Sequence, residues 1–229
     1  NKSSSSDMSA TAHVYGLLDR VGDALAEERE RLELKAIEMT RRNNEQTVAG
    51  RHRMMRRADR EVTEPQQIDA IIATCKIVSL AYTDAEGITI VPLNFGYVFD
   101  AESSHLTLYF HGSATGRKMD AVKAAGNALP VAFEMATDCE VVEGRTLCNW
   151  GEAFKSVIGN GVASMIDDLD ECRKGLRLLM GQQAGMPDIE FTDQQVRSVT
   201  VWKIEVRHLT AKIHAKPEPR NARRQAAGE

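Results

Sequence analysis

Residues 76–97 have the sequence KIVSLAYTDAEGITIVPLNFGY, and this stretch determines the fold class. Residues 76–83 are apolar and β-branched, which is typical of a strand. The turn residues 84–87 (DAEG) follow, and residues 88–97 form the return strand, in which Pro92 indicates an edge or a bulge. The sequence therefore predicts an antiparallel hairpin at this point.

Further strands and a few helices are predicted after this hairpin. The other expected strands share runs of apolar and β-branched residues, and they are residues 105–111, 129–135, 154–166 and 199–210. Helices are expected from about residue 63, where Ile68, Ile71 and Ile72 share a face, and at residues 116–125 and 167–180. Six strands with short links and few helices predict a mainly β fold, a six-stranded antiparallel barrel with peripheral helices.

Three regions differ in composition. Residues 1–60 are predicted to be a helical extension with a basic linker, residues 61–213 the barrel, and residues 214–229 a disordered tail. In the first region Val14, Leu18, Val21 and Leu25 follow helical spacing, which predicts a long helix over residues 12–42. The arginine cluster that follows is either a solvated linker or a patch for nucleic acid or an acidic partner, and it consists of Arg51, Arg53, Arg56, Arg57 and Arg60.

The composition limits the classes of function. The chain has 229 residues with a net charge of -4 and a pI near 5.9, so we expect no nucleic-acid partner for the molecule as a whole. No apolar run approaches the roughly 18 residues needed to cross a bilayer, and residues 1–7 contain no signal-peptide core, so we expect a cytoplasmic protein without a membrane span. The four cysteines form no CxxC pair and lack histidines at zinc spacing, which predicts free thiols and no metal site.

The candidate site lies in residues 109–120, YFHGSATGRKMD. A strand is expected to end at His111, and Arg117 and Lys118 open a helix after five small residues, Gly112, Ser113, Ala114, Thr115 and Gly116. Small residues let backbone N–H groups approach an anion, and a helix N-terminus adds unpaired donors. Two cations in the first helical turn oppose the helix dipole, and a bound phosphate would reverse that penalty. The residues alone leave a phosphate site and a solvated loop as alternatives, and no Walker or GxGxxG motif is present.

Five stretches in the chain resemble the nitroimidazole-resistance branch of the pyridoxamine 5'-phosphate oxidase-like superfamily. They are MRRADREVTEPQQIDAIIATCKIVSLAYTD, VPLNFGY, LYFHGSATGRKMDAV, CNWGEAFKSVIGNGVA and VTVWKIEV. Their order and spacing are similar to those of the family over about residues 54–213. The resemblance implies a split β-barrel that forms a homodimer and binds FMN at the subunit interface.

The resemblance also implies roles for individual residues. Arg117 and Lys118 match the pair that holds the FMN phosphate, beside Ser113 in the loop. His111 and Gly112 match positions next to the flavin, and His111 also resembles the histidine placed near the substrate. The remaining cofactor contacts implied by the resemblance are Pro92, Leu93, Asn94 and Phe95 along the ring and, near the cofactor, Lys155 and Ser156. The tail KPEPRNARRQ lacks the Trp and Arg that bind pyridoxamine phosphate, so vitamin B6 oxidation is not expected.

Taken together, these features predict an FMN-dependent oxidoreductase that passes electrons to a small acceptor, such as a nitro-aromatic or a quinone. Two other classes stay open. One is a haem-binding or haem-degrading split barrel, in which His111 or His208 would be the axial ligand. The other is a non-enzymatic binding or regulatory protein that uses its N-terminal helix and the arginine cluster as an interaction module. Trp202 is expected in the core. Trp150 either covers the flavin or packs in the barrel mouth, and packing is the favoured expectation.

Overall fold

The computed structural model describes residues 22, 24–29, 31–32, 35 and 54–216. The chain forms two compact units, residues 1–51 and 52–229. In the first unit every described residue is helical, and Leu25 and Leu32 are exposed. Three expectations fall wholly or partly outside the described residues, and these are the rest of the helix over 12–42, the cluster members Arg51 and Arg53, and the tail from residue 217 onwards.

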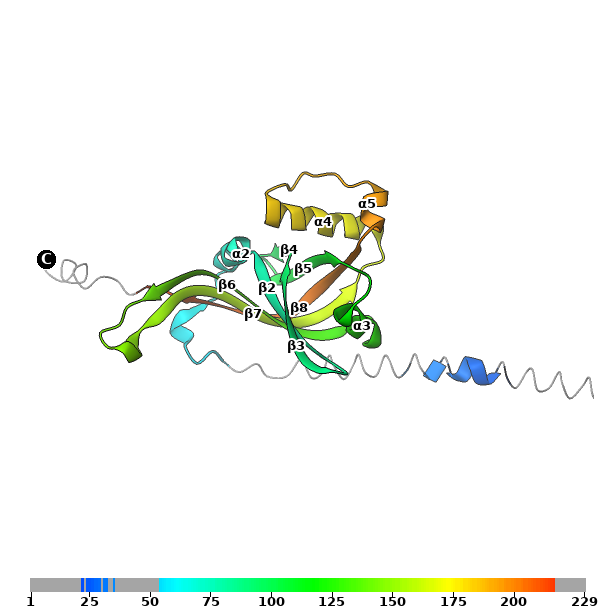
Figure 1. Ribbon diagram of the computed structural model, residues 1–229, viewed down its shortest axis with the longest axis horizontal. Helices are drawn as coiled ribbons and strands as arrows, with labels where there is room; N and C mark the ends of the chain where they lie inside the picture. The colour runs from blue at the N-terminus through cyan, green and yellow to red at the C-terminus, as the bar shows by residue number, and fades with distance from the viewer. Residues whose placement is uncertain (1–21, 23, 30, 33–34, 36–53, 217–229) are drawn as a thin grey trace, which may run out of the picture. The chain divides into compact units, whose positions relative to one another are not determined.

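The second unit is built around an antiparallel sheet of eight strands (Figure 1). The strands are β1 (Glu61–Val62), β2 (Ile77–Asp84), β3 (Gly87–Asn94), β4 (Gly96–Asp100), β5 (His105–Gly112), β6 (Leu129–Val142), β7 (Gly151–Met165) and β8 (Thr200–His214). They are arranged in the order β3-β2-β6-β7-β8-β5-β4, with β1 on β8. Strands β3 and β4 stand at opposite ends of this order, yet only Phe95 separates them in the chain. The sheet must therefore curl, which confirms the antiparallel split barrel. The described residues form eight strands and not the expected six, because β1 was not predicted and residues 88–97 are divided between two strands.

The expected strand at residues 88–97 is in fact two strands with different partners. Strand β3 pairs with β2, whereas β4 pairs with β5. The chain changes partners at Phe95, which is fully buried, and at Gly96. A Cβ atom on Gly96 would lie 2.3 Å from the backbone nitrogen of Leu179, so only glycine allows the close approach of the neighbouring helix.

Within residues 54–216 the barrel carries four α-helices, and they are α2 (Pro65–Thr74), α3 (Arg117–Ala124), α4 (Leu169–Ala184) and α5 (Asp193–Arg197). The first three confirm the expected helices, whereas α5 was not predicted. It begins with a capping box between Thr192 and Gln195. Figure 1 shows α4 and α5 together on one side of the barrel, where α4 lies over β4 and β5.

The end of α4 is fixed to the barrel by two glutamine side chains. The Nε2 atom of Gln182 donates to the carbonyl oxygens of Ile72 and Cys75, at the end of α2. The Nε2 atom of Gln183 donates to the carbonyl oxygen of Phe95 at 2.8 Å. The Ile72 carbonyl also accepts the backbone N–H of Cys75, whereas the Cys75 and Phe95 carbonyls lie just past a helix end and at a strand break, where the glutamines supply donors.

The barrel interior forms the main hydrophobic core. Trp202 is 1% exposed and stacks on Phe110 with a centroid distance of 4.1 Å, which confirms its expected place in the core. Each fully buried side chain of this size contributes on the order of 2 kcal/mol. A second, smaller cluster lies beneath α4, and its buried members include Tyr109, Cys172, Leu176 and Val201.

The outer face of the sheet carries exposed apolar side chains on β2, β3 and β7. Ile88 on β3 is 85% exposed, and the others are Ile77, Ile90 and Ile158. The β6–β7 hairpin extends beyond the barrel as an arm (Figure 1), where Leu147 and Trp150 are also exposed. Trp150 therefore lies on the arm, so the expectation that it packs in the barrel mouth is wrong. Single exposed apolar residues are ordinary, but a group of them on one face indicates a contact surface.

The cysteines are free thiols, as expected, with Cys75 and Cys172 buried and Cys139 and Cys148 exposed. None of the helices among the residues that the structure describes combines the length and the apolar character needed to span a bilayer.

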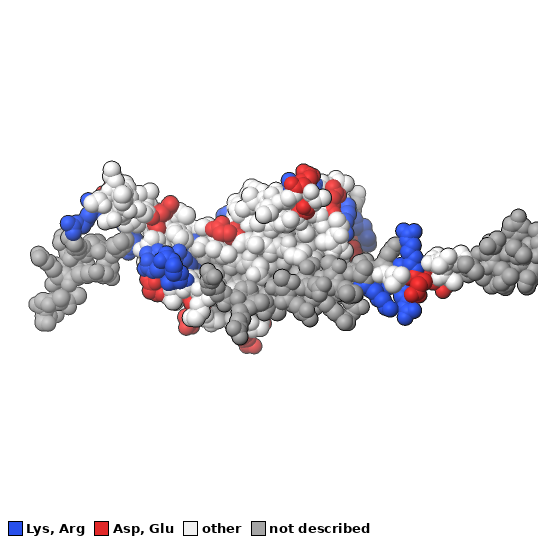
Figure 2. Space-filling view, turned by 90° about the horizontal axis from the view of Figure 1, so that it is seen from below, with Lys and Arg blue, Asp and Glu red and all other residues white. Residues whose placement is uncertain are grey.

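Figure 2 shows a largely uncharged surface on this face of the barrel unit, with a group of basic side chains at one end. Within the arginine cluster, Arg57 is paired with Asp59 at 2.6 Å.

Candidate functional site

The loop between β5 and α3 forms the centre of the candidate site. The hydroxyl groups of Ser113 and Thr115 lie 3.1 Å apart, and the backbone N–H of Thr115 donates to the Ser113 hydroxyl. Gly116 occupies the N-cap of α3 with φ of +110°, a conformation that favours glycine. Since glycine has no side chain, it leaves the first N–H groups of α3 without a side-chain cap. The anion site at this loop stays a prediction.

Arg117 points from the start of α3 to the β2–β3 turn. Its Nε and Nη2 atoms donate to the two carboxylate oxygens of Asp84, at 2.7 and 2.8 Å. The Nη2 atom also donates to the carbonyl oxygen of Gly87, at 3.3 Å. This bidentate contact holds the pKa of Asp84 below its usual value and raises the pKa of Arg117. Arg117 thus fixes the hairpin turn to α3, a role that the sequence did not reveal.

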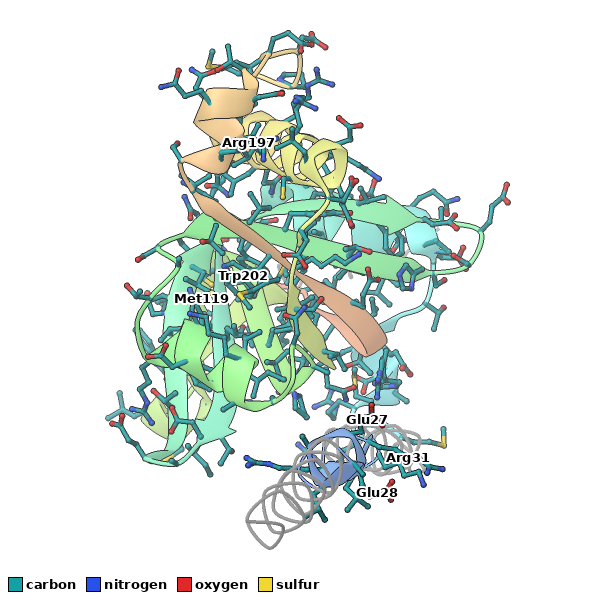
Figure 3. All side chains as sticks on the ribbon, turned by 90° about the vertical axis from the view of Figure 1, so that its right-hand side faces the viewer. Glu27, Glu28, Arg31, Met119, Arg197 and Trp202 are labelled. Carbon is teal, nitrogen blue, oxygen red and sulfur yellow. The ribbon has the colours of Figure 1, made fainter. Side chains whose placement is uncertain are left out.

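Lys118, the second cation of the pair, takes a different direction. Its Nζ atom lies 4.6 Å from the ring centroid of Trp202, a cation–π contact. The side chain is half-buried, and this burial lowers the pKa of its ammonium group. Figure 3 labels the next residue, Met119, and Trp202, both of which are buried in the barrel. Arg117 and Lys118 therefore begin the same helix but contact different parts of the barrel.

The ring-contact segment expected from the resemblance lies at a sheet edge. Strand β3 pairs only with β2 among the described strands, so one side of its backbone is open. Pro92 and Asn94 are exposed on it, Leu93 is half-buried, and Phe95 just beyond it is fully buried. The carbonyl oxygen of Phe95 already accepts a hydrogen bond from Gln183. The open edge therefore offers backbone groups over Pro92–Asn94 more readily than at Phe95.

His111 is exposed near the end of β5. It pairs in register with Val201 of β8, and Gly112 pairs with Thr200. Within the described part of the chain, the His111 ring makes no hydrogen bond. It stands next to the loop and is accessible to a small molecule.

Lys155 and Ser156 lie towards the opposite end of the barrel. Ser79 of β2 and Ile158 of β7 both pair with Glu134 of β6, so the three residues form one row across the sheet. Asp84 lies five residues from this row in one direction and Lys155 three residues in the other, so the two are eight residues apart along the strands. That separation corresponds to about 26 Å. The Lys155 ammonium pairs with Asp138 at 2.7 Å, and Ser156 is buried. Within one chain, these residues do not share a site with Arg117.

Two further features were missed by sequence reasoning. The Nζ atom of Lys123, in the last turn of α3, donates to the carbonyl oxygen of Ala114 at 2.8 Å and thereby ties the helix end to the loop. A cavity of about 320 Å³ lies between β1 and β8 and is lined by His208, Arg207 and Thr63, among others. Nothing in the sequence marks either feature, because both depend on residues brought together by folding.

The sequence profile of the pyridoxamine 5'-phosphate oxidase family matches residues 64–213. The chain belongs to this family. The match includes the loop, both cations and the β3 edge. No curated protein matches the chain in sequence.

Solved structures of similar proteins support the fold of this family member. A protein provisionally assigned to 5-nitroimidazole antibiotic resistance, from Bacteroides thetaiotaomicron, is 28% identical with a TM-score of 0.55, and the alignment covers 67% of this chain and 86% of that one. The FAD and haem binding protein from Mycobacterium smegmatis is 18% identical with a TM-score of 0.58, covering 74% and 81%. The flavocytochrome Anf3 from Azotobacter vinelandii is 16% identical with a TM-score of 0.60, covering 80% and 82%. The last two are similar in fold alone.

Proposed function

We propose that this protein binds FMN at the loop before α3 and acts as an oxidoreductase that passes electrons to a small acceptor, such as a nitro-aromatic or a quinone. The observation that carries the proposal is the uncapped N-terminus of α3, which follows a loop of small residues and opens with two cations. A flavin phosphate matches this donor set, and membership of the family adds independent support.

When bound, the flavin supplies the hydride and electron chemistry, while the chain binds and orients it. The N–H groups of the loop and of the first turn of α3 donate to the phosphate, and Lys118 supplies positive charge. The open backbone edge at Pro92–Asn94 would contact the ring. His111, which is exposed beside the loop, orients the acceptor or donates a proton to it.

We further propose that two copies of the chain form each flavin site. Two observations support this arrangement. Lys155 and Ser156 lie about 26 Å along the strands from Asp84, so if both ends contact one flavin, they belong to different copies. The exposed isoleucines on β2, β3 and β7 also give a sheet face suited to burial against a second copy.

A haem protein is the second candidate, and one observation favours it. His208 is half-buried and lines the cavity between β1 and β8, where it could serve as an axial ligand. His111 suits that role less well because it is exposed at a strand end.

The absorption spectrum of the purified full-length chain, with the mass of the molecule that co-purifies, tests the proposal. We expect flavin bands, the mass of FMN and one FMN per chain. A Soret band would favour the haem candidate instead. A colourless protein that also fails to bind added FMN would contradict both candidates.

A further inference from the structure

The β2–β3 turn occupies most of the hydrogen-bonding capacity of Arg117. A guanidinium group has five N–H donors. Three of them are used by the turn, since Nε and Nη2 donate to Asp84 and Nη2 also donates to the carbonyl oxygen of Gly87. The two donors on Nη1 remain, and the carboxylate of Glu86 lies 3.7 Å from that atom. The acceptors around this arginine therefore come from the turn.

A phosphate at the start of α3 would need the same donors. Guanidinium groups bind carboxylate and phosphate in the same way, through two parallel N–H groups. Asp84 already fills one such pair with contacts of 2.7 and 2.8 Å, and its side chain is only 11% exposed. The carboxylate thus takes the place that a phosphate would take on this side of Arg117.

The surrounding charges act in the same direction. The turn and the first turn of α3 carry three acidic side chains, Asp84, Glu86 and Asp120, against the cations Arg117 and Lys118. Lys118 lies over Trp202 and not beside the turn. A phosphate dianion approaching the turn is repelled by these carboxylates, whereas a flavin without phosphate has no charge to repel.

We infer that Asp84 competes with a ligand phosphate for Arg117 and thereby sets how strongly the site prefers a phosphorylated flavin over one without phosphate. This inference rests on the proposed function. It predicts that neutralising Asp84 strengthens the binding of FMN and leaves riboflavin unaffected. If Asp84 instead served to orient Arg117 for the phosphate, the same change would weaken FMN binding.

The test compares Asp84→Asn with a matched control, Asp100→Asn, in the full-length chain. Asp100 makes an equivalent contact in the next hairpin. The Asp100 carboxylate accepts the backbone N–H of Glu102 at 3.0 Å, and the Asp84 carboxylate accepts the backbone N–H of Glu86 at 2.9 Å. It forms no ion pair with a lysine or arginine among the described residues. Dissociation constants for FMN and riboflavin are measured by fluorescence titration.

We expect Asp84→Asn to bind FMN about tenfold more tightly, equivalent to about 1.4 kcal/mol, with riboflavin affinity unchanged. Asp100→Asn should change neither constant. Equal or weaker FMN binding by folded Asp84→Asn would overturn the inference. If Asp84→Asn does not fold, the FMN dissociation constant of Glu86→Gln tests the inference instead. Glu86 is exposed, and neutralising it should also strengthen FMN binding, by less than tenfold. An unchanged FMN constant in Glu86→Gln would then overturn it.

Inorganic phosphate separates this inference from the proposed function. If neither the parent nor any variant binds either flavin, the proposed function fails. The competition for Arg117 is then decided by the rise in melting temperature that added phosphate produces. A larger rise in Asp84→Asn than in the parent supports the competition, and equal rises overturn it.

Discussion

Replacing Lys118 by methionine tests the phosphate site most directly. Methionine retains an unbranched apolar side chain against Trp202 and removes the ammonium group, which lies 4.6 Å from the ring centroid. The fold should survive, because a cation–π contact at a half-buried position contributes about 1 kcal/mol and burial of the charge offsets part of it. Lys118→Met should therefore change the free energy of unfolding by less than about 1 kcal/mol.

The effect on flavin binding should be larger and specific to phosphate. The proposed function requires the Lys118 ammonium, which lies over Trp202, to donate one hydrogen bond to the phosphate. Such a bond contributes about 1.5–3 kcal/mol, so its loss weakens FMN binding about 10- to 100-fold. Riboflavin, which lacks the phosphate, should bind the variant and the parent equally. The assay is fluorescence titration with both flavins, and Lys174→Met on the exposed surface of α4 controls for the change in net charge. A ratio of FMN to riboflavin affinity equal to that of the parent would refute the role of Lys118.

Three further predictions concern the acceptor, the sheet face and the fold. His111→Ala should retain flavin but lose much of its reductase activity towards a nitro-aromatic acceptor, and unchanged steady-state kinetics with several acceptors would leave His111 without a catalytic role. Ile90→Glu should convert a dimer to a monomer in light scattering, because it places a charge on the exposed sheet face, while Ile90→Val should remain dimeric. A monomeric parent that holds FMN stoichiometrically would contradict the two-copy site. Gly96→Ala should lower the free energy of unfolding in urea by about 3 kcal/mol, because its Cβ would lie 2.3 Å from the α4 backbone, whereas Gly151→Ala, with open space around it, should change it by less than about 0.5 kcal/mol.

The sequence predicted the barrel because its strands follow local rules. Apolar alternation over β2 and the glycine at Gly87, which has φ of +107°, are properties of neighbouring residues, and the structure has the expected hairpin there. The same rules located α3 and the small-residue loop before it. Family resemblance then indicated which ligand such a loop would hold, which stays a prediction, while the match at residues 64–213 confirms the family itself.

The local sequence pattern could not reveal where the chain leaves β2 and begins to pair with β5. The stretch 88–97 has the composition of one strand throughout, yet β3 and β4 pair at opposite ends of the sheet order. The change occurs because Phe95 is buried in the core and the backbone of α4 packs against Gly96, which is 83 residues before Leu179 in the sequence. Trp150 was misplaced for a similar reason, since only the length of the β6–β7 arm carries it beyond the barrel.

The sequence by itself determined which residues open α3, whereas the tertiary structure decided what they contact. Arg117 and Lys118 are adjacent in the chain and look alike as phosphate ligands. Successive residues on a helix point about 100° apart, so one reaches the turn at Asp84, 33 residues earlier, and the other reaches Trp202, 84 residues later. Those partners come from strands whose positions depend on the packing of the whole barrel, which local sequence patterns do not encode.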